Sequence, residues 1–289
     1  MKKLNISSQA MLVSSKFKLL GIYRKDEVAT DHVNTHYEAK DVAKVTKCLL
    51  QGRHLKNIKA VRTAVCDFIG KHTLPWSEDG KRLLPATNFD KFQAQIEDFK
   101  HQWKIEVDDF IRRYDDILYE SASMSGKLFE ANAFPSKDDI KKKFSFSVNF
   151  SSVPNANDFR IELIGESAEA EIRKSIEDQV SSEVLDGKKD ILERITKNMK
   201  HLAGVLTDPN KQFRKSALTN AKEMATLLND LNITEDETIT KLSESTSKLL
   251  NDFDPDTLVE GGQEIQQQAG EKVQEHMADL EQTASQIFG

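Results

Sequence analysis

One apolar stripe in the first half of the chain constrains the fold more than any other feature. From Asn88 onward, apolar residues recur at steps of three or four over about thirty residues, which places them on one face of a single long helix. Most of them are aromatic, so we expect this face to be covered, either by the protein's own core or by a permanent subunit interface. The stripe consists of Phe89, Phe92, Ile96, Phe99, Trp103, Val107, Phe110, Tyr114 and Ile117.

A short segment downstream offers a matching apolar face. Apolar and polar side chains alternate over residues 144–151, as in a strand with one buried face. Residues 11–23 predict a second strand, with Val13 and Phe17 on one side and Lys16 on the other. We predict that the aromatic helix packs on the first of these faces, which is made by Phe144, Phe146, Val148 and Phe150.

Two further segments complete the predicted first domain. Residues 56–70 have the apolar spacing of an amphipathic helix that ends near Gly70. Phe159, Ile161 and Leu163 alternate after a turn, which predicts a strand that returns from residues 144–151 as a hairpin. The sequence therefore predicts an α+β fold, with a small antiparallel sheet covered by a long aromatic helix.

The pattern changes beyond Gly165. One helical stripe runs from Ile172 to Leu202, which is longer than an ordinary globular helix and indicates a coiled-coil or bundle arm that Gly187 weakens or bends. Thr234 and Glu237 have the spacing of a capping box for a later helix. We predict three consecutive parts: an α+β head (1–165), a long-helix coiled-coil or bundle domain (166–252) and an acidic amphipathic C-terminal helix (253–289).

Charge is distributed unevenly along the sequence. The chain has 289 residues and a formal net charge of −6, but residues 253–289 contain eight acids and one Lys. The preceding residues hold 39 acids and 40 bases and are nearly neutral. Bulk charge therefore gives no reason to expect nucleic-acid binding.

The cysteines and the apolar runs predict a compartment. Cys48 and Cys66 form no CxxC pair, and two thiols in a chain of this length suit a reducing environment. Asn5 and Ser7 interrupt the first apolar run, which is too polar for a signal peptide, and no apolar span of about 18 residues follows. We expect a soluble cytoplasmic protein that makes no membrane contact.

Motifs for catalysis are weak. His32 and His36 stand four residues apart near Glu38, but HVNTH lacks the Glu of a zincin, so surface histidines are the simpler interpretation. Gly126 and Lys127 lack the other residues of a phosphate-binding loop, and GxSxG, GxGxxG and paired CxxC motifs do not occur. We predict a protein without enzymatic activity and without a cofactor. A metal-dependent enzyme is the third hypothesis.

Two groups of basic residues are candidates for contacts with phosphate. One lies along the polar face of the helix near residues 54–70, and the other precedes the strand at residue 144. Both have the composition of a nucleic-acid surface, although such groups are more often solvated faces. The candidate contacts are Arg53, Lys56, Lys59, Arg62, Lys141, Lys142 and Lys143.

Several motifs together resemble those of a known family. The order LPW-SEDG-KRLLP-ATNF, a long helix, FPSKDDIKKKFSFSVNFSSVPNANDFRI and a long helical tail resembles a family of uncharacterised proteins from bacteriophages and mobile elements. Members are commonly encoded beside a MoxR-type AAA+ ATPase and a von Willebrand A-domain protein similar to cobaltochelatase subunits. The resemblance covers Val13 to Leu250 and supplies no catalytic residues. It implies a phage-type protein in the bacterial cytoplasm that acts as a client or adaptor of an AAA+ machine.

Long apolar stripes without a catalytic constellation favour an assembly protein. Our leading hypothesis is a non-enzymatic protein that forms homo-oligomers or docks a partner through its helical arms, with the AAA+ ATPase and the von Willebrand A-domain protein as candidate partners. The alternative is a nucleic-acid-binding protein that uses the basic face of helix 54–70 and Lys141–Lys143.

Overall fold

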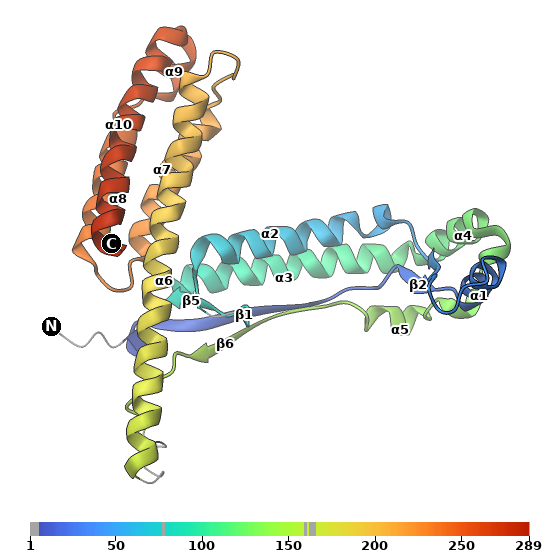
Figure 1. Cartoon of the computed structure of the whole chain (residues 1–289). Helices are drawn as coiled ribbons and strands as arrows, with labels where there is room; N and C mark the ends of the chain where they lie inside the picture. The colour runs from blue at the N-terminus through green and yellow to red at the C-terminus, as the bar shows by residue number, and fades with distance from the viewer. Residues whose placement is uncertain (1–5, 77–78, 159–160, 162–165, 289) are drawn as a thin grey trace. The chain divides into compact units, whose positions relative to one another are not determined.

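The chain forms two compact units, each assembled from separate segments. The computed structural model describes residues 6–76, 79–158, 161 and 166–288. Unit 1 comprises Met1–Ser14, Gly70–Asp90 and Phe150–Gly289, and unit 2 comprises Ser15–Ile69 and Lys91–Asn149. Helices dominate both units (Figure 1).

A small sheet accompanies the helices. Its strands are β4 (Leu74–Pro75), β5 (Arg82–Pro85), β1 (Ala10–Lys18) and β6 (Ser145–Ser152), side by side in that order. β1 and β5 pair antiparallel, with Leu12 opposite Leu83, and β4 pairs antiparallel with β5. The predicted α+β class, with a small antiparallel sheet and helical arms, is therefore confirmed.

The aromatic helix packs on the strand face that its spacing predicts. α3 (Phe89–Arg112) carries the stripe. In unit 2 the rings of Trp103 and Phe146 lie 5.9 Å apart, and those of Phe110 and Phe144 lie 5.3 Å apart. In unit 1 Phe89 contacts Phe150 at 5.3 Å. The polar residues between the β6 aromatics are exposed, because successive side chains of a strand point to opposite faces.

The amphipathic helix at residues 56–70 is α2 (Lys56–His72), and it lies beside α3 (Figure 1). Phe68 of α2 packs against two rings of α3, 5.2 Å from Phe92 and 5.6 Å from Phe99. The aromatic stripe is thus covered from two sides in unit 2, by α2 and by β6.

Two local predictions differ from the structure. The predicted continuous helix ends at Arg112, and α4 (Tyr114–Ser125) begins after one intervening residue, because Arg113 leaves helical geometry with ψ near 4°. The buried Tyr114 starts the new helix and donates a hydrogen bond to the carbonyl of Pro135 at 2.9 Å. The predicted returning strand includes Phe159 and Leu163, which lie outside the described residues, and the neighbour of β6 in the sheet is β1.

The remaining elements of unit 2 form its small second sheet and short helices. β2 (Tyr23–Lys25) pairs antiparallel with β3 (Thr46–Cys48). Between them runs α1 (Glu27–His36), capped by Asp26, whose carboxylate accepts from the N–H of Ala29 at 2.9 Å. α5 (Lys137–Lys141) precedes β6 and is capped by Ser136.

Unit 1 is built around a helical bundle. Its helices are α6 (Glu166–Thr207), α7 (Lys215–Leu231), α8 (Glu237–Asn251), α9 (Pro255–Glu260) and α10 (Gly262–Phe288). α6 packs against both α10 and α7, and α7 packs against α8 (Figure 1). One apolar core includes buried residues from α6, α7, α8 and α10, namely Ile195, Leu202, Leu228, Ile239, Val273 and Leu280 among others.

The units differ from the three consecutive parts that the sequence suggests. The acidic C-terminal helix belongs to the bundle because Val273 and Leu280 of α10 are buried in the core that α6 contributes to. Residues 70–90 also join unit 1, since β4 packs against α6 through Leu74. Contacts between segments far apart in sequence define the units, and such contacts leave no signal in local spacing.

Two glycines permit close helix packing. A Cβ atom at Gly187 would lie 3.2 Å from Leu74 Cδ1, so the absence of a side chain lets α6 pass over β4. α6 continues through this position instead of ending there. At Gly270 a Cβ atom would lie 3.2 Å from Leu206 Cβ, which explains how α10 approaches α6 so closely. None of the described helices is both long and apolar enough for a membrane span.

Replacement of Trp103 by Ala should destabilise the protein strongly. Trp103 is only 6% exposed and contacts Phe17 as well as Phe146. We expect the free energy of unfolding to fall by about 3–5 kcal/mol, as for other large core truncations. Ile105→Ala on the same helix is the control, because Ile105 is 51% exposed and should cost less than about 0.5 kcal/mol. Urea denaturation followed by circular dichroism measures both. If the variant keeps its stability but elutes at a different volume in size-exclusion chromatography, the stripe would instead lie in an interface between copies of the chain.

Candidate functional site

The first half of α6 carries an apolar stripe that the described part of the chain leaves half exposed. Ile172, Ile176, Val180 and Val184 repeat every four residues on this half, and each is only partly buried. Residues 168–186 include no buried side chain. Beyond Gly187 the same helix contributes buried side chains to the core of the bundle. One helix thus has a covered half and an open half, and in the open half Val180 and Val184 still pack against the bundle core.

A cleft lies beside this open half. Its volume is about 750 Å³, and α6 supplies Ile176, Val180 and Val184 to its wall. Ile6 and the loop at residues 154–157 form other parts of the wall. Its lining mixes aliphatic and polar side chains, as protein-binding and ligand-binding clefts commonly do.

Arg173 fastens the loop to α6. Its guanidinium pairs with Glu169 one turn earlier on the helix, with 2.8 Å between Nε and the carboxylate. It also donates to the carbonyl of Ala156, and its Nη1 lies 3.5 Å from Oδ1 of Asn157. The loop wall of the cleft is therefore tied to the helix that carries the stripe.

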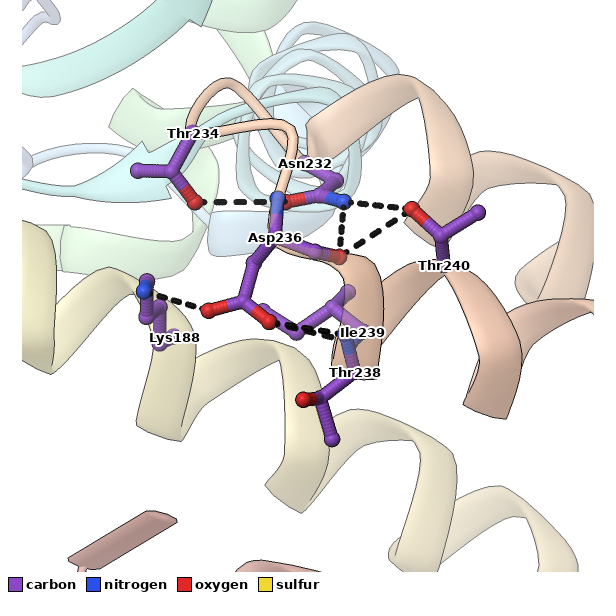
Figure 2. A network of polar contacts seen from close by, with 7 residues as sticks. All are labelled: Lys188, Asn232, Thr234, Asp236, Thr238, Ile239 and Thr240. Atoms are coloured by element: carbon purple, nitrogen blue, oxygen red, sulfur yellow. Dashed lines mark hydrogen bonds and ion pairs between the residues drawn. The ribbon is translucent and has the colours of Figure 1, made fainter. Parts of the chain in front are cut away.

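A polar network at the turn between α7 and α8 borders the cleft (Figure 2). The amide of Asn232 spans this turn: its oxygen accepts from the N–H of Asp236 at 3.0 Å and from the hydroxyl of Thr234 at 3.3 Å. Its nitrogen donates to the carbonyl of Asp236 and to the hydroxyl of Thr240, both at 3.0 Å. These bonds satisfy polar groups at the point where the chain reverses.

Asp236 connects this turn to α6. Its carboxylate caps α8 by accepting from the N–H groups of Thr238 at 2.9 Å and Ile239 at 3.4 Å. Its other oxygen lies 2.6 Å from Nζ of Lys188 on α6 (Figure 2). Burial raises the pKa of Asp236, but the hydrogen bond and charge of Lys188 and the two N–H donors outweigh it, so the pKa lies below its usual range.

Sequence reasoning missed most of these residues. It assigned the cap of α8 to Thr234 and Glu237, whereas Asp236 is the capping residue and the helix begins at Glu237. Thr and Asp are both good caps, so spacing alone did not separate them. Nothing in the local pattern indicates that Lys188, some fifty residues earlier, pairs with this cap.

The predicted basic residues of α2, and Arg53 in the turn before it, are surface residues. Lys56 and Lys59 are exposed. Arg53 pairs with Glu120, and the guanidinium of Arg62 lies over the ring of Phe17, 5.8 Å from its centroid. Part of the charge in this group is therefore already compensated within unit 2.

The second basic group is also exposed. Lys141, Lys142 and Lys143 lie at the end of α5 and just before β6. Lys142 pairs with Asp139 at 2.9 Å, and this contact raises the pKa of Lys142 and lowers that of Asp139. Within unit 2, α2 and α5 lie apart (Figure 1). The two basic groups therefore do not form one continuous surface.

The aromatic stripe contributes to the core. Phe92, Phe99, Trp103 and Phe110 are buried, and Phe89 is half buried. The four buried side chains are therefore unavailable as a free binding surface, and Phe89 packs against Phe150.

The histidine pair is placed on a helix that sequence reasoning did not predict. His32 and His36 lie on α1, and both are exposed. Within the described ranges no cluster of three or more His, Cys, Asp or Glu residues has the arrangement of a metal site.

A smaller cavity in unit 2 is lined in part by an ion-pair triad. Lys47 of β3 lies 2.6 Å from Glu130 and 3.4 Å from Asp26, and the side chains of Lys47 and Asp26 are nearly buried. The cavity of about 370 Å³ also contacts Cys48 and Phe129. Because all three charges are paired, the simplest role of the triad is to hold the second sheet against the segment at residues 124–134.

The fold and the cleft define an α+β protein with a helical bundle and a half-exposed arm helix. Residues 24–275 match the family described as protein of unknown function (DUF3150), and the chain belongs to this family. The match covers the aromatic stripe and the α6 side of the cleft, but it does not include Ile6 of the cleft wall. No curated protein and no solved structure matches the chain.

Substitutions at Asp236 should separate its capping role from its charge. Asp236→Ala removes the cap and leaves Lys188 without its partner, so we expect a loss of about 1–3 kcal/mol in unfolding free energy. Asp236→Asn keeps a good cap and should cost less than Asp236→Ala. Chemical denaturation of the full chain measures both, and equal losses would show that the cap contributes little.

The substitutions at Asp236 should also change how the unfolding free energy depends on pH. The folded-state pKa of Asp236 is lowered, so its contribution is present above the unfolded value of 3.8 and is lost as pH falls through the lower folded value. Asp236→Asn should therefore flatten the decline in stability at acid pH.

Proposed function

We propose that the protein is a non-enzymatic assembly or adaptor protein that docks a partner through the open half of α6. The observation that carries the proposal is the change of environment along one helix: the stripe is core beyond Gly187 and half exposed before it. Partly exposed apolar side chains in a row beside a cleft are compatible with an interaction site.

The energy available from the stripe suits an interaction surface. Complete burial of an aliphatic side chain is worth about 1.5–3 kcal/mol, and the four stripe residues are already mostly buried, so finishing their burial supplies at most about 2–4 kcal/mol. Micromolar association needs about 8 kcal/mol, and polar contacts at the rim of the cleft would add to the apolar term.

The partners that we propose come from the family resemblance. They are a MoxR-type AAA+ ATPase and a von Willebrand A-domain protein, met in the cytoplasm of a bacterial host. Self-association into a homo-oligomer is the other way to cover the stripe. In either case the protein acts through binding and not through catalysis.

Charged substitutions in the stripe should abolish assembly without unfolding the protein. Ile176→Glu with Val180→Glu places two charges where burial is required for docking, while both positions tolerate partial hydration in the isolated chain. Light scattering of the protein alone, and mixed with each proposed partner, should show loss of the complex formed by the wild type. Circular dichroism should show that the variant remains folded, with a lower melting temperature because Val180 packs against the bundle core.

A matched control uses the same chemistry on another face of α6. Ser175 and Ser182 are exposed and seven residues apart, so Ser175→Glu with Ser182→Glu adds the same charge away from the stripe. The control should assemble normally. A wild-type protein that remains a monomer and binds neither partner would contradict the proposal.

Nucleic-acid binding is the second candidate, favoured by the exposed charges of Lys56, Lys59, Lys141 and Lys143. Contacts with phosphate predict an affinity that falls steeply with salt concentration. Fluorescence anisotropy with single- and double-stranded DNA and RNA tests this, and reversal of each basic group to Glu should weaken binding. Unchanged binding in both variants would exclude these groups as the surface.

A further inference from the structure

The two units carry opposite net charges. Unit 2 contains 21 bases and 17 acids, a net charge of +4, whereas unit 1 contains 20 bases and 30 acids, a net charge of −10. The near-neutral charge of residues 1–252 hides this difference, because it averages unit 2 with the acidic residues 150–252 of unit 1. A surface that attracts a polyanion is therefore to be sought on unit 2.

Unit 2 contains a two-stranded ribbon with one covered face. Within the described sheet β5 pairs with β1 at Ala10–Val13, so residues 15–18 of β1 have β6 as their neighbour. Phe17 of β1 stacks on Phe146 of β6 with ring centroids 4.7 Å apart, and Trp103 of α3 contacts both rings. A guanidinium group of α2 also lies over the Phe17 ring. α2 and α3 thus cover the face that carries the rings, and they lie together on one side of β1 (Figure 1).

The opposite face of this ribbon is polar, positively charged and open. Successive side chains of a strand point to opposite faces, so the residues next to the two stacked rings point away from α2 and α3. The exposed residues of this open face are Lys16, Lys18, Ser145, Ser147 and Asn149. None of the ion pairs among the described residues involves either of these two lysines. The open face therefore combines uncompensated positive charge with hydrogen-bond donors and carries no carboxylate.

Further lysines extend the positive charge beyond the end of the ribbon. Lys141 and Lys143 are exposed and lie just before β6 begins. Lys142 between them is compensated by Asp139 at 2.9 Å and by the nearby charge of Asp138. A polyanion that follows the open face towards the start of β6 therefore meets additional positive charge.

The chemistry of the open face distinguishes between kinds of nucleic acid. Single strands are held largely by stacking of bases on aromatic side chains, and the rings of this ribbon point to the covered face. The major groove of A-form RNA is too deep and narrow for side chains to enter. The major groove of B-form DNA is about 12 Å wide and admits a two-stranded β-ribbon. Lys, Ser and Asn side chains donate to phosphate oxygens and to base edges in that groove.

From these features we infer that the open face of the β1–β6 ribbon binds double-stranded DNA along its major groove. Lys16 and Lys18 pair with phosphates, and the serines and Asn149 donate to phosphates or base edges. The inference goes beyond the proposed docking function of α6. It also differs from DNA binding through the basic face of α2, because α2 lies on the covered side of the ribbon.

The test measures fluorescence anisotropy of the full-length protein with a labelled DNA duplex of about 20 base pairs, roughly two helical turns. One strand of that duplex alone and an RNA duplex of the same length are the comparisons. The wild type should bind the DNA duplex most tightly at low salt. Each lost phosphate contact lowers the slope of log affinity against log salt by about 0.9, so Lys16→Gln with Lys18→Gln should flatten the slope by about 2. We expect the same variant to bind about tenfold or more weakly at low salt.

A second variant leaves both lysines in place. Ser147→Glu puts a carboxylate on the open face between the two strands' charged and polar residues, and its charge should repel phosphate and weaken DNA binding. Because Ser147 is exposed, this variant should fold, and circular dichroism of each variant checks that it does. Wild-type affinity in the folded Ser147→Glu variant would contradict the inference.

A charge-matched control separates the ribbon from general attraction to unit 2. Lys56 and Lys59 are exposed on α2, so Lys56→Gln with Lys59→Gln removes the same charge from the covered side of the ribbon. This control should keep the affinity and the salt slope of the wild type. Equal losses in both double variants would show general attraction, and a loss in the control alone would place the DNA on α2. Either result would overturn the inference, as would equal or tighter binding of the single strand or the RNA duplex.

Discussion

The length of α6 sets the organisation of unit 1. A helix of 42 residues extends about 63 Å, whereas α10, with 27 residues, extends about 40 Å. No antiparallel partner of that length can cover α6 from end to end. The bundle buries the half of α6 beyond Gly187, and the stripe residues in the half before it are only partly buried. The candidate docking surface is a consequence of this difference in length.

Much of the fold follows from local spacing. The steps of the aromatic stripe placed α3 correctly, and the alternation at residues 144–151 placed β6 and chose its apolar face. Ring contacts such as Trp103 with Phe146 then show that the two faces meet. Local spacing succeeded here because both elements need one buried face and their side chains are too large to remain exposed.

The candidate site was not predictable in the same way. The apolar period of α6 is similar before and after Gly187, so spacing cannot say which half finds a partner within the chain. The ion pair of Lys188 with Asp236 joins residues 48 positions apart, and only the fold brings them together. The sequence suggested that Gly187 weakens the helix, whereas its missing side chain allows α6 to pack closely against Leu74. Helix propensity describes the backbone preference of the residue itself. It cannot reveal which side chains from other segments pack against that residue.

The polar network at the α7–α8 turn marks the boundary between the two halves of α6. Lys188 follows Gly187 directly, and its pairing with Asp236 places a satisfied charge pair where the apolar core ends. A charge pair that keeps partial contact with water resists being drawn into an apolar core, because its desolvation would cost more than the ion pair returns. The acids of residues 169–186 extend this effect along the open half. Exposed acids such as Glu171 and Asp178 hydrate the face of this half that lies away from the stripe, so apolar contacts of the open half are confined to the stripe itself.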